Sequence, residues 1–117
     1  MTEVLCRLSD LDATGAKEII RTEGSIRAAI FVIRYKGRVY AYVNSCPHVR
    51  LPLNWNDDVF FDAGGQYILC GNHAARFEAA TGLCLRGPCK GQSLTPVPVA
   101  IEDDNIRLTG PFPMPVR

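Results

Sequence analysis

The chain has 117 residues, of which 47% are hydrophobic and 21% are charged, and its formal net charge is +1. This balance predicts one globular domain over residues 1–117, with a core of its own. It provides no general attraction for nucleic acid or for an anionic membrane surface, and no stretch approaches the ~20 apolar residues of a membrane span.

The first half of the chain predicts short strands. Residues 4–8 read as a first strand, and residues 9–21 predict no more than a short helical turn, because Gly15 disfavours a long helix. Residues 28–35 and 38–43 are rich in β-branched and aromatic residues and flank a Lys-Gly turn, which predicts a β-hairpin.

The second half continues the same pattern. Residues 66–69 predict a strand, residues 75–85 a tight hairpin, and residues 94–108 two strands around an acidic turn. Two prolines confine the first of these last strands to a sheet edge or an irregular path. The proline-rich tail, residues 110–117, is expected to be extended without regular structure. The whole pattern predicts an all-β fold of small sheets.

The two histidines of the chain each follow a cysteine closely, as Cys46-Pro47-His48 and as Cys70-Gly71-Asn72-His73. Both pairs come directly after a predicted strand, on loops, where binding sites are commonly carried. The N-terminus has no secretory signal, which indicates a cytoplasmic protein with reduced thiols. An odd number of cysteines, five, also favours metal or redox chemistry over a disulfide framework.

Sulfur and imidazole donors together suit zinc or iron–sulfur chemistry. Structural zinc sites more often take two cysteines from one loop and two histidines from the other, whereas each loop here supplies one of each. That arrangement suits a two-metal cluster in which one iron has two thiolates and the other has two imidazoles. A structural zinc site remains the alternative.

The chain resembles a small Rieske [2Fe–2S] protein of the ferredoxin type, from the strand before Cys46 to the closing strands near Leu108. The two Cys/His loops match the family's first and second cluster loops, and "TGLCLRGPCKG", residues 81–91, matches its hairpin and third loop. The resemblance implies stacked antiparallel sheets with a small cluster-binding subdomain at about residues 44–90.

The resemblance also implies the ligand set of one [2Fe–2S] cluster. By it, Cys46 and Cys70 ligate the inner iron, and His48 and His73 ligate the outer, more exposed iron. In the third loop, the Gly-Pro pair that begins at Gly87 would lie over the cluster.

The function implied is transport of one electron, with no substrate converted. The partners implied are redox proteins, namely a reductase and a non-haem iron oxygenase or another acceptor. Alternatives are a small subunit of a larger, nitrite-reductase-like enzyme and a zinc-stabilised binding module. No nucleophile–base pair or nucleotide-binding motif is present, and both histidines are already assigned as ligands, so none remains as a general base.

The other cysteines have structural interpretations. Cys6 and Cys84 are expected to pack in the core, and Cys89 to be a packed thiol near the cluster. A Cys84–Cys89 disulfide is disfavoured in a reducing cytoplasm. Leu53 and Trp55 are expected to pack the first loop against the rest of the domain.

High-potential Rieske proteins resemble this chain but carry features that it lacks. Where they have two further cysteines that cross-link the cluster loops, this chain has Leu51 and Gly71. Where they have a serine and a tyrosine whose hydroxyls donate toward the cluster and its sulfurs, it has Ala75 and Phe77. Missing donors predict a low reduction potential within the family's range.

Overall fold

Three antiparallel sheets make up the fold. The computed structural model describes residues 3–47, 52–54, 58–71 and 74–113. Within them, nine strands form three sheets of three strands each, in the orders β1-β9-β8, β2-β3-β4 and β5-β6-β7. The elements are β1 (Glu3–Arg7), the 3-10 helix η1 (Leu8–Leu11), β2 (Ala16–Glu23), β3 (Ile26–Tyr35), β4 (Arg38–Val43), β5 (Tyr67–Leu69), β6 (Arg76–Glu78), β7 (Cys84–Arg86), β8 (Val99–Glu102) and β9 (Asn105–Leu108). The predicted all-β class is confirmed.

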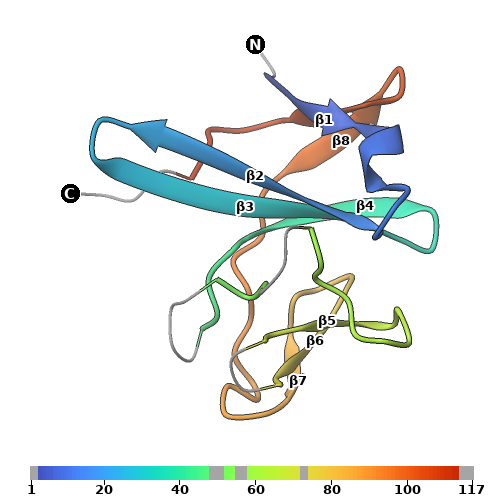
Figure 1. Ribbon diagram of the computed structural model, residues 1–117, viewed down its shortest axis with the longest axis vertical. Coiled ribbons are helices and arrows are strands. Elements are labelled where there is room, and N and C mark those ends of the chain that lie inside the picture. The colour runs from blue at the N-terminus through green and yellow to red at the C-terminus, as the bar shows by residue number, and fades with distance from the viewer. Residues whose placement is uncertain (1–2, 48–51, 55–57, 72–73, 114–117) are drawn as a thin grey trace.

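The β2-β3-β4 sheet is the middle layer, with β1, β8 and β9 on one side and β5, β6 and β7 on the other (Figure 1). Successive side chains of a strand point to opposite faces, so the middle sheet can supply two cores. On β3, Ile30 and Val32 enter the core shared with the β1-β9-β8 sheet, and Phe31 and Ile33 enter the core shared with β5-β6-β7. The uninterrupted apolar run of β3 therefore reflects burial on both faces.

The hairpins predicted from turn residues are confirmed. Between β3 and β4, Lys36 and Gly37 have φ of 50° and 78°, so both central residues of the turn are left-handed. Asp103 and Asp104, between β8 and β9, have φ of 51° and 65°. Two-residue turns of this kind match the right-handed twist of the strands that they join.

Strand β2 was not predicted. Residues 9–21 were expected to contain turn residues and a short helical turn, and the helical turn is confirmed at Leu8–Leu11. The following residues instead pair with β3 along the full length of β2, from Ala16 opposite Ile33 to Glu23 opposite Ile26. Pairing with a strand that is buried on both faces outweighs the polar, non-alternating sequence of β2.

The ends of the chain agree with the prediction as far as they are described. Cys6 is buried in the core next to the β1-β9-β8 sheet, as expected. Strand β8 begins only at Val99, after both prolines, and lies at a sheet edge. Residues 110–113 have no regular structure, and the rest of the tail lies outside the described residues. No helix in the described part of the chain has the length and apolar character needed to cross a bilayer.

Candidate metal centre

The short β5-β6-β7 sheet lies at one end of the molecule and is anchored to the middle sheet by aromatic packing. The rings of Phe31 and Phe60 stack with centroids 4.2 Å apart. Tyr42 of β4 donates a hydrogen bond of 2.7 Å from its hydroxyl to the backbone oxygen of Ala79, beyond β6. These contacts hold the sheet that carries the second cluster loop against the sheet that leads into the first.

The first Cys/His loop leaves β4 and is closed by a side chain. Asn44 is 6% exposed, and its Oδ1 accepts a hydrogen bond of 2.8 Å from the backbone N–H of Leu53. This bond joins the two ends of the loop that contains Cys46, whose side chain is 0% exposed. Leu53 is buried in the same core, as predicted, whereas Trp55 and His48 lie outside the described residues.

The second loop leaves β5 and is closed by backbone bonds. The N–H of Cys70 donates to the oxygen of Ala75 at 2.8 Å, and the N–H of Gly71 donates to the oxygen of Leu53 at 2.8 Å. The second of these bonds ties the second loop directly to the first. Cys70 is also 0% exposed, and His73 lies outside the described residues.

The third loop, residues 86–92, packs against the second loop through a glycine. A Cβ added at Gly87 would lie 2.9 Å from the Cα and 3.0 Å from the Cβ of Ala75, and Gly87 has a φ of +105°. Only glycine permits both this backbone conformation and this close approach. The Gly-Pro segment is therefore held against the residues that follow the second Cys/His pair.

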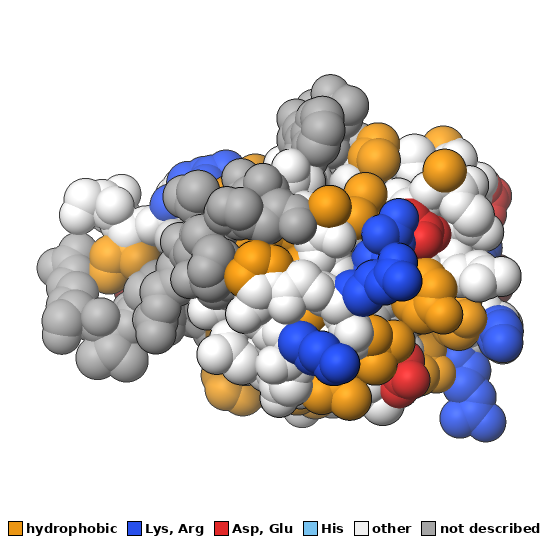
Figure 2. Space-filling view, turned by 90° about the horizontal axis from the view of Figure 1, so that it is seen from below, with side chains coloured by type: hydrophobic (Ala, Val, Ile, Leu, Met, Phe, Trp, Pro, Cys, Tyr) orange, Lys and Arg blue, Asp and Glu red, His pale blue; other side chains and the backbone are white. Residues whose placement is uncertain are grey.

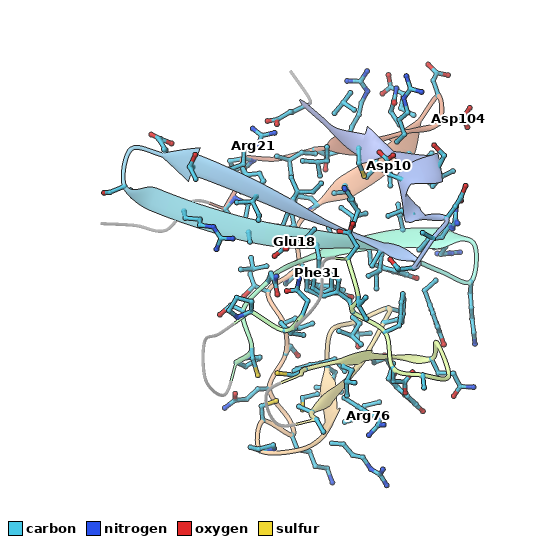
Figure 3. The ribbon with its side chains drawn as sticks, in the orientation of Figure 1. Asp10, Glu18, Arg21, Phe31, Arg76 and Asp104 are labelled. Atoms are coloured by element: carbon cyan, nitrogen blue, oxygen red, sulfur yellow. The ribbon has the colours of Figure 1, made fainter. Side chains whose placement is uncertain are left out.

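Four cysteines share one core: Cys46, Cys70 and Cys89 from the three loops, and Cys84 from the start of β7. Sulfur atoms gather at this end of the molecule, beside the β5-β6-β7 sheet (Figure 3). All five cysteines of the chain are thiols rather than disulfides. Burial, followed by the neighbouring thiols of Cys84 and Cys46, raises the pKa of Cys89 to about 12.

Cys46 and Cys70 fit the thiolate half of an iron–sulfur site. Both are fully buried in an apolar core, come from separate loops that are hydrogen-bonded to each other, and provide the soft donor that iron–sulfur clusters require. Within the described ranges, no group of three or more His, Cys, Asp or Glu side chains is arranged to hold a metal. Both predicted histidine ligands fall outside those ranges, so the imidazole half stays a prediction.

A polar network beside the first loop was missed by the sequence analysis. The Nδ2 of Asn44 donates to Glu18 Oε2 at 2.6 Å and to Asn54 Oδ1 at 2.9 Å, and Asn54 Nδ2 donates to Glu18 Oε1 at 3.2 Å. Glu18 lies on β2 of the middle sheet (Figure 3). An asparagine two residues before a candidate ligand is common in loops, so no sequence signal identified the network.

Comparisons with known proteins agree with this arrangement. The family model described as "Rieske [2Fe-2S] domain" matches residues 2–102. No curated protein matches the chain significantly.

Among solved structures, the chain is similar to the Sphingomonas yanoikuyae B1 ferredoxin, with 24% identity and a TM-score of 0.69 over 95% of this chain and 100% of that one. It is similar to the ferredoxin of carbazole 1,9a-dioxygenase from Nocardioides aromaticivorans IC177, with 23% identity and a TM-score of 0.68 over 92% and 96%. A protein assigned as the small subunit of an NADPH nitrite reductase has 21% identity and a TM-score of 0.63 over 94% and 99%. At these identities the structural matches establish the shared fold.

Proposed function

Because the chain belongs to the Rieske [2Fe–2S] domain family, we propose that it is an electron carrier that converts no substrate itself. The family binds a [2Fe–2S] cluster, which when bound takes up and releases one electron. The observation that carries the proposal is the pair of fully buried thiols, Cys46 and Cys70, on two loops tied together through Leu53 and Gly71.

We propose that Cys46 and Cys70 hold one iron and that His48 and His73 hold the other. Residues 44–90, which contain all four ligands and most of the third loop, then act as the cluster-binding subdomain. In this subdomain the hydrogen bond between Asn44 and Leu53 fixes the shape of the first loop, and Ala75 packs against Gly87 of the third loop. The surrounding apolar core excludes water from the cysteine sulfurs.

The proposed partners are a reductase and a non-haem iron oxygenase. Two of the similar structures are ferredoxins, and one of these belongs to a carbazole dioxygenase. At the end of this molecule that carries β5-β6-β7, hydrophobic side chains and Lys and Arg side chains both lie on the surface (Figure 2). Leu83 and Leu85, each 37% exposed, lie close in sequence to the exposed Arg86 and Lys90. Such a mixed surface suits brief docking to another protein. We place this exchange in the cytoplasm.

Cluster content and ligand variants test the proposal. Anaerobically purified protein should contain two irons and two sulfides per chain and, when reduced, give the electron paramagnetic resonance signal of a Rieske centre. His48→Ala and His73→Ala should each lose that signal, and the matched control Cys6→Ser should keep it because Cys6 lies in the other core. A colourless protein with one zinc would support the binding-module alternative instead.

A second test concerns the electron acceptor. The reduced protein should transfer its electron to a Rieske oxygenase at a rate that depends on ionic strength. The similarity to a protein assigned as a nitrite reductase small subunit favours one alternative to a free carrier, namely a permanent small subunit of a larger redox enzyme. Expression in the native host with an affinity tag separates the two, because a carrier purifies alone and a subunit purifies with a large chain in fixed ratio.

A further inference from the structure

Two cysteines outside the proposed ligand set lie in contact with each other. The Sγ atoms of Cys84 and Cys89 are 3.0 Å apart, and the two residues are 2% and 1% exposed. A disulfide bond has an S–S length of about 2.05 Å, so these sulfurs need to approach by about 1 Å to bond. Across the 3.0 Å between the sulfurs the Cys89 thiol donates a hydrogen bond to the Cys84 sulfur, and the Cys84 thiol in turn donates to the backbone oxygen of Arg86 at 3.1 Å, so the two thiols form a hydrogen-bonded pair.

The backbone holds the two sulfurs in this position. The N–H of Gly91 donates to the oxygen of Cys84 at 3.1 Å, and the N–H of Cys84 donates to the oxygen of Gln92 at 2.8 Å. The N–H of Gln92 also donates to the oxygen of Cys89 at 2.8 Å. The third loop therefore returns to β7 and is closed at its base before any bond between the sulfurs forms.

We propose that Cys84 and Cys89 form a dithiol–disulfide couple that locks the third loop closed. The oxidant is a low-molecular-weight disulfide, which reacts by thiol–disulfide exchange. One protein thiolate attacks it to give a mixed disulfide and releases one small thiol, and the second protein thiolate then displaces the other. The S–S bond forms in the protein as the S–S bond of the small disulfide breaks. Two electrons and the two thiol protons end on the two small thiols.

The position of the pair gives the bond a structural consequence. Gly87, which packs on Ala75 of the second loop, lies within the segment that the bond would close. The bridged form therefore holds the third loop against the second more tightly than the dithiol form does. Because both thiols are buried, exchange is slow, and in a reducing compartment the pair rests as two thiols until the ratio of disulfide to thiol rises.

Mass spectrometry of the holoprotein tests the couple without any measurement of electron transfer. The protein is equilibrated anaerobically in buffers of increasing oxidised-to-reduced glutathione ratio, quenched with acid, and alkylated under denaturing conditions. We expect two fewer alkylated cysteines in the oxidising buffers, and a peptide map that joins Cys84 to Cys89. The bridge should be absent from Cys84→Ser and Cys89→Ser and present in the control Cys6→Ser.

The wild-type peptide map decides the question even if a serine variant fails to fold. The proposal is overturned if both thiols remain alkylated in the most oxidising buffer. It is equally overturned if each carries glutathione separately, or if either is bridged to Cys46 or Cys70. The same readout applies whether or not the protein proves to be an electron carrier.

Discussion

Replacement of Glu18 should loosen the first cluster loop, although Glu18 lies on β2 and not on the loop. Its two carboxylate oxygens accept hydrogen bonds from Asn44 at 2.6 Å and from Asn54 at 3.2 Å. Asn44 in turn closes the loop through the N–H of Leu53 at 2.8 Å. Glu18→Ala removes both acceptors and leaves one N–H of the buried Asn44 amide without its carboxylate partner.

The expected cost follows from these contacts. A hydrogen bond to a charged group contributes about 1.5–3 kcal/mol to stability. Because Glu18 is partly exposed to water, we expect Glu18→Ala to lower the free energy of unfolding by about 2 kcal/mol in all. In a chain of this size that corresponds to a fall in Tm of about 6–12 °C. Glu18→Gln keeps one good acceptor, so its free energy of unfolding should fall by about half as much. If cluster loss proceeds through opening of the loop, 2 kcal/mol raises its rate by up to about 30-fold.

The assay is the rate at which visible absorption bleaches in excess chelator, measured with Tm on the same samples. Glu23→Ala is the matched control, because Glu23 is an exposed glutamate at the far end of the same strand. The order expected is wild type and Glu23→Ala slowest, Glu18→Gln intermediate, and Glu18→Ala fastest. Equal bleaching rates for Glu18→Ala and Glu23→Ala would refute the idea that β2 holds the first loop.

Three further predictions concern the other loops and the core. Gly87→Ala should speed bleaching more than Gly91→Ala. Both glycines have positive φ, but only a Cβ added at Gly87 would contact Ala75, at 2.9 Å from its Cα. Equal bleaching rates for the two variants would mean that backbone strain alone matters. Protein-film voltammetry should give a potential toward the low end of the roughly −150 to +300 mV Rieske range, and Ala75→Ser, which adds a hydroxyl donor, should raise it; a wild-type value near the top would contradict this. Burial raises the pKa of Tyr42 to about 12, so its contribution to stability is complete below pH ~10 and is lost as pH rises toward 12. Tyr42→Phe should therefore weaken the fall in Tm over that interval, and an unchanged pH profile would exclude Tyr42 as its source.

The sequence by itself determined the features that depend on neighbouring residues. The hairpins followed from turn residues such as Lys36-Gly37, whose left-handed backbone suits a two-residue turn whatever surrounds it. The spacing of side chains, Cys-x-His and Cys-x-x-His, indicated a site with sulfur and imidazole donors, because metal preference is a property of the donor atoms. For the same reason the family, and with it the cluster, could be inferred from two loops and a Gly-Pro segment. The assignment of the four ligands came from the resemblance to the family and stays a prediction, since His48 and His73 lie outside the described residues.

Only the tertiary structure decided what depends on residues far apart in the chain. Strand β2 has no alternating pattern and forms because β3 lies beside it. Glu18 reaches Asn44 across 26 positions. Cys84 and Cys89 are close in sequence, but their 3.0 Å contact depends on the path by which the loop returns to β7. Such contacts depend on how strands pair and how layers stack, and local residue preference does not encode either.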